Sequence, residues 1–311
     1  MIKAIFIVGP TASGKTALSI HLARLFGGEI ISADSMQIYK GIHIASAAPD
    51  EDEKCGVPHH LIEFLETSEE YSVADYVEEA RICIKEIASR GKLPIIVGGT
   101  GLYISSLLDN TEFIDGETDF ALRKCLEERF DAIGGEKMLE ELAVFDKETA
   151  ERLHPNNRRR IIRAFEVYEL TGKTITEQNE NSHKNKSFID PFVIGISYDD
   201  REKLYERINL RVDIMLENGL LEEAHKTYLS ANGKGAFQAI GHKELYSYFS
   251  GESSLEEATE HLKQQTRRYA KRQLTWFRRD ERINWIFADS CDNVFDSATS
   301  LIKEFLKEEN K

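Results

Sequence analysis

Eight residues near the N-terminus, Gly9-Pro10-Thr11-Ala12-Ser13-Gly14-Lys15-Thr16, match the pattern G-x-x-x-x-G-K-[ST]. An apolar run at residues 2–8 precedes them, and helical spacing of apolar residues follows at 17–26. In this strand, loop and helix order the pattern is typical of a phosphate-binding loop, or P-loop. Its glycines let successive backbone N–H groups turn toward one anion, at a helix N-terminus that already favours negative charge.

The P-loop therefore predicts a polyphosphate site. Lys15 supplies a positive charge for the terminal phosphates, and the Thr16 hydroxyl is expected to ligate Mg²⁺. The residues expected to bind the phosphates are Gly9, Thr11, Ala12, Ser13, Gly14, Lys15 and Thr16.

Further short apolar runs predict strands at residues 29–33, 93–97, 192–196 and 284–287, and helical patterns separate most of them. Such alternation predicts an α/β fold, a P-loop NTPase-like parallel sheet flanked by helices. Residues 113–191 carry helical patterns without strands, with an exposed polar loop at 180–187. We interpret 113–191 as an inserted all-helical domain, and residues 1–112 with 192–311 as the catalytic core and its C-terminal helices.

The distribution of charge bears on possible partners. A formal net charge of −14 argues against a nucleic-acid partner, because phosphate neutralisation drives such binding. The basic residues are segregated, however: residues 152–163 contain five arginines and no acid, and residues 263–282 contain eight basic residues against two acids. Local basic surfaces on an acidic protein remain compatible with a polyanionic partner.

Composition also bounds the cellular setting. No apolar run approaches the roughly 20 residues that a membrane helix needs, and no secretory pattern opens the chain. The four cysteines are scattered without a C-x-x-C pair, which favours reduced thiols over disulfides or a zinc site. We expect a cytoplasmic protein with no membrane partner, and no feature of the sequence demands more than a monomer.

A carboxylate follows the second predicted strand, in Asp34-Ser35-Met36-Gln37-Ile38-Tyr39. Ligands of open α/β sheets bind outside the carboxyl ends of the strands, so Asp34 is expected near the P-loop. There it could hold Mg²⁺ or accept a proton from a nucleophile. The alternative is an aspartate that only caps a helix or a turn.

The third strand leads into Gly98-Gly99-Thr100-Gly101, whereas the corresponding strand of an ordinary P-loop NTPase delivers an aspartate to the metal. This difference weakens an ATPase or GTPase interpretation. The glycines permit close backbone approach and Thr100 offers a hydroxyl. A tight turn with no further role is the alternative.

Together, several blocks in a fixed order resemble the bacterial tRNA dimethylallyltransferase (isopentenyl-tRNA transferase) family. The resemblance runs over nearly the whole chain, and several blocks are close to family-specific. The blocks are residues 9–16, 34–39, 58–61, 98–103, 154–163, 238–244 and 267–278.

The resemblance implies transfer of a dimethylallyl group from dimethylallyl diphosphate to the exocyclic N6 of an adenosine immediately 3′ of a tRNA anticodon. The P-loop would then hold a leaving diphosphate, with Mg²⁺ as cofactor, and the partner would be the anticodon stem–loop. Because a stacked adenine cannot be reached, the base is expected to flip into a channel.

The resemblance also implies roles for individual residues. Asp34 matches the general base, Thr100 a positioning hydroxyl, and Arg211 an arginine that reaches the diphosphate; alone, Arg211 reads as a solvated helix charge. The residues matching tRNA contacts are Asp34, Ser35, Met36, Gln37, Arg123, Arg159, Arg160, Ile161, Ile162, Arg163, Gln238, Gly241, Lys243, Arg268, Lys271 and Arg272.

The chain departs from the family pattern at a few positions. Ala45, Ser46 and Ala48 replace usual family residues, including a lysine at Ala48, and His242 replaces a tyrosine. The pair His59-His60 suggests metal ligands, but a packed turn after Pro58 is the simpler interpretation.

Two other function classes share part of this pattern. A small-molecule P-loop kinase would share the loop, the sheet and an insertion, but it does not explain Asp34 to Tyr39 or the basic C-terminal segment. An RNA-binding protein that uses a nucleotide only as a switch would not catalyse transfer.

Overall fold

The computed structural model describes residues 1–111, 113, 119–184, 187–229 and 239–307. The chain forms two compact units: a core unit, Met1–Leu107 with Phe188–Lys311, and an inserted unit, Leu108–Ser187. These boundaries lie a few residues before those expected after residues 112 and 191, since Pro191 belongs to a strand of the core unit.

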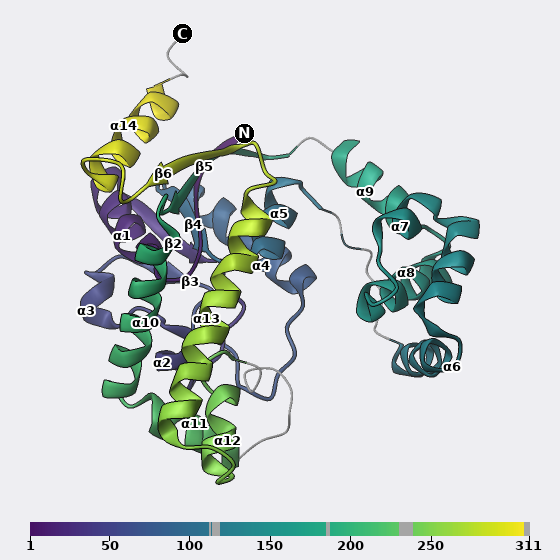
Figure 1. Ribbon diagram of the computed structural model, residues 1–311. Coiled ribbons are helices and arrows are strands. Elements are labelled where there is room, and N and C mark those ends of the chain that lie inside the picture. Colours follow the sequence, from purple (N-terminus) through teal and green to yellow (C-terminus); the bar gives the residue numbers. More distant parts are fainter. Residues whose placement is uncertain (112, 114–118, 185–186, 230–238, 308–311) are drawn as a thin grey trace. The chain divides into compact units, whose positions relative to one another are not determined.

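The core unit contains one six-stranded sheet in which every neighbouring pair is parallel, as predicted for the α/β fold. The strand order is β3-β2-β4-β1-β5-β6 (Figure 1). The strands are β1 (Ile2–Val8), β2 (Gly28–Ser32), β3 (His59–His60), β4 (Leu93–Gly98), β5 (Ile189–Ser197) and β6 (Ile283–Phe287).

The edge strand β3 corrects the expectation of a packed turn at His59-His60. It pairs with β2 through Ile30 and Ile31. His60 Nε2 lies 2.7 Å from Glu29 Oε2, and His59 Nδ1 lies 2.8 Å from the Val57 carbonyl oxygen. Both histidines therefore stabilise this sheet edge.

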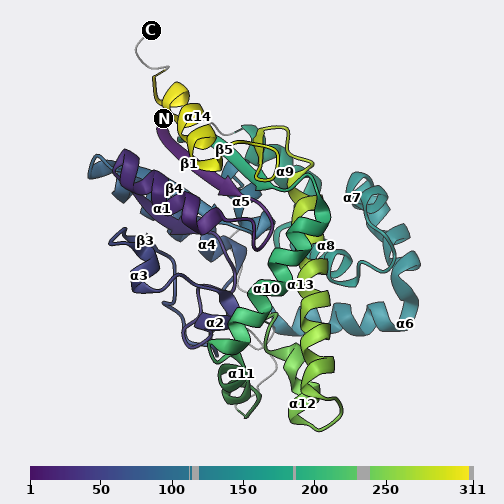
Figure 2. The same ribbon diagram turned by 60° about the vertical axis from the view of Figure 1, so that its left-hand side comes forward.

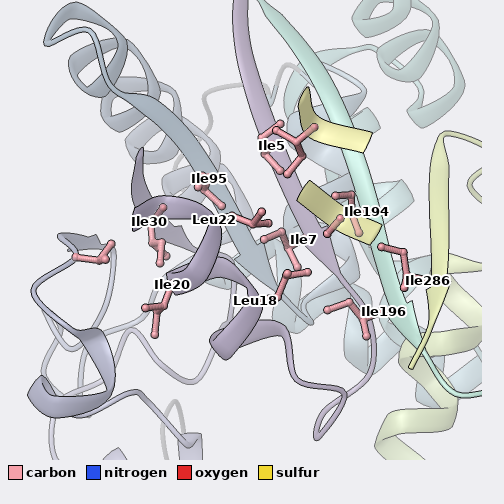
Figure 3. Close-up of a cluster of buried hydrophobic side chains, with 14 residues drawn as sticks. Ile5, Ile7, Leu18, Ile20, Leu22, Ile30, Ile95, Ile194, Ile196 and Ile286 are labelled. Atoms are coloured by element: carbon pink, nitrogen blue, oxygen red, sulfur yellow. The ribbon is translucent and has the colours of Figure 1, made fainter. Parts of the chain in front are cut away.

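Helices cover both faces of the sheet. On one face, α1 and α14 enclose a cluster that includes Ile5, Ile7, Ile194 and Ile286 (Figure 3). On the other, α4 contacts β1, β2 and β4. Burial on both faces explains why residues 2–8 read as one continuous apolar run.

The remaining helices of the core unit extend beyond the sheet, and two views show α10 and α13 side by side (Figures 1 and 2). A capping box between Ser254 and Glu257 starts α13. The complete set of α-helices described in the core unit, those on the sheet included, is α1 (Lys15–Phe26), α2 (His43–Ser46), α3 (Glu51–Lys54), α4 (Val73–Ser89), α5 (Gly101–Leu108), α10 (Arg201–Glu217), α11 (Leu220–Leu229), α12 (Tyr246–Phe249), α13 (Leu255–Phe277) and α14 (Val294–Lys307).

The inserted unit is helical: α6 (Phe120–Phe145), α7 (Lys147–Arg152), α8 (Arg158–Thr171) and α9 (Ile175–Lys184). Its own core includes Met138, Leu142, Ile161 and Phe165. The exposed loop expected at 180–187 is wrong in part, because α9 continues to Lys184. Thr174 and Glu177 exchange backbone-to-side-chain hydrogen bonds of 2.8 and 3.0 Å, a capping box that starts this helix.

Within the described ranges, no helix is long and apolar enough to cross a bilayer.

Candidate active site

Three turns meet at one edge of the sheet, because β1, β2 and β4 are parallel neighbours. They are the P-loop after β1, the turn at Asp34 after β2, and Gly98–Gly101 after β4. The last two touch directly: a Cβ atom at Gly98 would lie 2.1 Å from the Ala33 carbonyl oxygen. Glycine is required at this position so that the Asp34 turn can pack against the end of β4.

The P-loop has the geometry of an anion cradle. Gly9 and Gly14 take φ angles of 144° and 97°, and a Cβ at Gly9 would lie 2.3 Å from the Ile196 carbonyl oxygen. Among the described residues, no side chain caps the N-terminus of α1. Nor does any described group hydrogen-bond the buried Ser13 hydroxyl. These donors are suited to phosphate oxygens.

Two cations flank this cradle. Burial, and secondarily the neighbouring Arg211 guanidinium, lower the pKa of Lys15 to about 7, against an opposing effect of Asp34. Burial also lowers the pKa of Arg211, while Asp34 and Glu53 act to raise it. Burying like charges together is unfavourable unless an anion binds between them. Lys15 and Arg211 are therefore suited to hold an anion between them.

Lys15, Thr16 and Arg211 line both of two adjoining cavities of the core unit. One, of about 320 Å³, has Asp34 and Gln37 in its wall, with Ser35 and Met36 between them. The other, of about 860 Å³, contacts the P-loop. A diphosphate on the P-loop would thus lie where the two cavities meet.

Neighbouring groups orient the carboxylate of Asp34. Asp34 Oδ1 accepts the Met36 N–H at 2.9 Å, and Thr100 Oγ1 accepts the Ser35 N–H at 3.0 Å. Thr100 is not among the described residues that line either cavity. Its hydroxyl therefore acts on the site by holding the residue next to Asp34.

The helix α2 forms one wall of the smaller cavity through Ala45 and Ser46. Gln37 Nε2 donates to the Ala47 carbonyl oxygen at 3.1 Å. At the start of α2, Glu223 accepts the backbone N–H groups of Ile44 and Ala45 at 2.8 and 2.9 Å. Glu223 thus holds the start of α2, and Gln37 holds the residue that follows its end.

The structure shows what surrounds two of the residues that depart from the family pattern, His242 and Ala48. His242 is fully buried, with Nε2 2.9 Å from Glu223 and Nδ1 3.1 Å from the Thr227 hydroxyl. Its side chain supports the Glu223 contacts with α2. Ala48 is 5% exposed and lines the larger cavity.

The basic C-terminal segment lies on α13, with Arg268, Lys271 and Arg272 exposed. Arg272 also lines the smaller cavity, as do Gly241 and Lys243. Gln238, predicted as a tRNA contact, lies outside the described residues.

In the inserted unit, the predicted tRNA segment 159–163 divides into two sets. Arg159, Arg160 and Arg163 are exposed on α8, whereas Ile161 and Ile162 are 0% and 4% exposed within the core. The prediction of tRNA contacts by these two isoleucines is therefore wrong for their side chains, because helical spacing turns them inward.

Arg123, predicted as a single tRNA contact, forms a two-point ion pair with Glu166. Its Nη2 donates to Glu166 Oε2 at 3.0 Å, and its Nε to Oε1. Glu166 is 3% exposed and also accepts from Arg163 at 3.4 Å. Arg123 therefore compensates a buried carboxylate of the inserted unit.

Two residues near the P-loop, Arg207 and Gln273, escaped sequence reasoning. Arg207 Nε donates to the Ala12 carbonyl oxygen at 3.0 Å, and Gln273 contacts Thr11. Tyr269 lines the smaller cavity. A spacing of four residues could have pointed to them, because residues four apart lie on the same face of a helix. Arg207 shares a face with Arg211 in this way, and Gln273 shares one with Tyr269.

The arrangement agrees with comparisons to known proteins. A family profile described as IPP transferase matches residues 37–280, and one described as isopentenyl transferase matches residues 2–63. The tRNA dimethylallyltransferase of Acetivibrio thermocellus is 51% identical over 305 residues, covering 97% of this chain and 96% of that protein.

Solved structures agree with this match. The crystal structure of the tRNA isopentenylpyrophosphate transferase from Bacillus halodurans has a TM-score of 0.72 at 42% identity, covering 98% of this chain and 96% of its own. A eukaryotic dimethylallyltransferase acting on tRNA has a TM-score of 0.86 at 31% identity, covering 99% and 80%. The resemblance drawn from the sequence motifs is confirmed: this chain belongs to the tRNA dimethylallyltransferase family.

Proposed function

We propose that this protein transfers the dimethylallyl group of dimethylallyl diphosphate to N6 of the adenosine immediately 3′ of the anticodon in tRNA. One observation carries the proposal beyond family membership. The half-buried cations Lys15 and Arg211 and the carboxylate of Asp34 line one cavity. This supports the proposal, because the reaction requires an anion site beside a proton acceptor.

The leaving group is stabilised at the P-loop. The bond between C1 of the dimethylallyl group and the diphosphate oxygen breaks, and negative charge develops on the diphosphate. Lys15, Arg211 and the N–H groups at the start of α1 would stabilise that charge where it appears. Because these donors are held by the fold, little reorganisation accompanies bond cleavage.

The nucleophile is activated on the other side of the reacting carbon. The new bond joins C1 to N6 of the adenine, and N6 loses one proton. Asp34 would accept it as general base. The contact of Asp34 Oδ1 with the Met36 N–H and the contact of Thr100 with Ser35 hold this carboxylate in place.

Mg²⁺ is proposed as the cofactor. Thr16 and Asp34 line the same cavity, while the described residues contain no group of three or more metal-binding side chains. One hydroxyl and one carboxylate fit an ion that keeps several waters and is bound largely through phosphate oxygens. When bound, it would neutralise charge on the diphosphate.

Exposed basic residues of each unit are proposed to bind the tRNA backbone. Arg159, Arg160 and Arg163 serve in the inserted unit, and Arg268, Lys271 and Arg272 on α13 in the core unit. Such contacts neutralise phosphates and position the nucleic acid without reading its sequence. Gly241, Lys243, and Ser35 to Gln37 would surround the flipped base.

The test is transfer of label from dimethylallyl diphosphate, radiolabelled in the prenyl group, to unmodified tRNA in the presence of Mg²⁺. Nucleoside analysis should recover the label as N6-dimethylallyladenosine. A matched tRNA with guanosine in place of the target adenosine should remain unlabelled, and chelation of Mg²⁺ should abolish transfer.

A parallel incubation with γ-labelled ATP and a metabolite extract tests the kinase alternative. Label in a metabolite but none in tRNA would contradict the proposed function. Binding of tRNA without any transfer would instead support the nucleotide-switch alternative.

A further inference from the structure

One amide on α13 joins the two glycine-rich turns of the site. Gln273 Oε1 accepts the Thr11 N–H of the P-loop at 2.8 Å, and Gln273 Nε2 donates to the Gly99 carbonyl oxygen at 3.0 Å. Gln273 is 5% exposed. A single side chain thus uses both ends of its amide to hold the diphosphate loop at a fixed distance from the turn that carries Thr100.

The glycine-rich turn is shaped to receive this helix. A Cβ atom at Gly99 would lie 2.1 Å from Gln273 Nε2, and one at Gly101 would lie 2.5 Å from Trp276 Cδ1. The absence of side chains there therefore serves the approach of α13. Tyr269, one helical turn before Gln273, lines the smaller cavity together with it.

The contact with Gln273 also shows what one backbone N–H group of the P-loop binds. Since the Thr11 N–H is directed to Gln273, it serves the attachment of the loop to α13, and the diphosphate is left with the donors nearer α1. On its other side the loop is held by Arg207, whose guanidinium lies 5.6 Å from the centre of the Tyr198 ring. The P-loop is thus fastened to two C-terminal helices.

We propose that Gln273 is a positioning residue for prenyl transfer, which sets the separation between the leaving diphosphate on the P-loop and the Thr100–Ser35–Asp34 group that orients the nucleophile. The inference rests on the proposed function. It follows from geometry: the amide touches both turns, and under the proposed function the reacting atoms would lie between the groups that these turns carry. Small errors in such a separation are costly, since a displacement of about 1 Å can cost about 10²-fold in rate.

The experiment compares Gln273→Met with wild type. Methionine has a similar length and removes both hydrogen bonds. We expect kcat, at saturating dimethylallyl diphosphate and tRNA, to fall by about 10- to 100-fold. The Kd values for inorganic pyrophosphate with Mg²⁺ and for tRNA should change little, because Lys15, Arg211 and the exposed arginines remain.

The matched control is Gln264→Met, the same change at an exposed position of α13. It should retain wild-type kcat. Circular dichroism melting would confirm that each variant is folded at the assay temperature. If Gln273→Met does not fold, Gln273→Glu replaces it: a carboxylate still accepts the Thr11 N–H but cannot donate to Gly99, so kcat should again fall.

The outcomes separate the two claims. Absence of transfer by the wild-type protein would refute the proposed function. Transfer by the wild type together with unchanged kcat in a folded Gln273 variant would overturn the inference. So would a variant whose only defect is weaker pyrophosphate binding or a lower melting temperature, because then the amide would serve affinity or stability instead of positioning.

Discussion

The core unit and the inserted unit use positive charge in opposite ways. In the core unit, Lys15 and Arg211 are half-buried beside Asp34, and their partial removal from solvent lowers both pKa values. In the inserted unit, Arg159, Arg160 and Arg163 stand exposed over a buried layer that contains Ile161 and Ile162. Buried charges act strongly on one bound group, whereas exposed charges act weakly, additively and in a salt-dependent manner.

The largest effect is expected at Asp34. Asp34→Asn keeps an acceptor for the Met36 N–H but removes the base, so kcat should fall by about 10²- to 10⁴-fold. The tRNA Kd should stay near the wild-type value. Filter binding and single-turnover transfer measure the two quantities, with the exposed Asp52→Asn as control. Near-normal turnover would remove Asp34 from the role of base.

The next effect concerns Lys15. Lys15→Met removes one charged donor from the anion site, and we expect pyrophosphate affinity to fall by about 10- to 100-fold, the value of one hydrogen bond to a charged group. Isothermal titration calorimetry would measure it. Lys226→Met, a change of the same kind on α11 away from the two cavities, should leave this affinity unchanged. Equal losses in both variants would contradict a local role.

A smaller, graded effect is expected from pH. Lys15 has a pKa of about 7 in the free protein, and a bound anion stabilises the ammonium form, raising that pKa. The complex therefore holds more protons than the free protein. Pyrophosphate affinity should accordingly decline as pH rises above about 7, by at most about tenfold per unit.

Lys15→Met separates this effect from the titration of pyrophosphate itself, which affects both proteins equally. The ratio of the wild-type to the variant affinity should be highest below pH 7. A ratio that stays constant between pH 6 and about 9 would show that Lys15 does not change protonation on binding.

The smallest effects should come from the exposed arginines. Arg159→Gln and Arg160→Gln should each weaken tRNA binding a fewfold at low salt and reduce the slope of log K against log[salt] by about one. Lys147→Gln, which removes a charge paired with Glu151 on α7, is the control. An unchanged salt slope in the arginine variants would exclude phosphate contacts at these positions.

Sequence reasoning located the parts of the site that follow directly from strand ends. The P-loop and Asp34 each come just after an apolar run, and the parallel sheet brings them to one edge. The core sheet was predictable because burial on both faces leaves unbroken apolar strands. A two-residue strand such as β3 carries no such signal, since two residues show no periodicity.

Other features depended on tertiary contacts. Gln273 reads as one polar residue in a basic helix, and only its contacts with Thr11 and Gly99 reveal a role. His242 likewise reads only as a departure from the family's tyrosine until Glu223 is found beside it. Ile161 and Ile162, by contrast, were predictable as core residues from helical spacing, had 159–163 not been treated as one contacting segment.

The attachment of the P-loop to Arg207 and Gln273 has a consequence for synthesis of the chain. The loop is made before its partners, which lie 195 and 262 residues later along the chain. Strand β1 likewise pairs with β5, which is made much later. The inserted unit, by contrast, forms its core from contacts within about 80 residues of chain. Local contacts form faster than distant ones. On the ribosome, the inserted unit can therefore fold before the sheet is complete, and the diphosphate site becomes competent only after α13 has emerged.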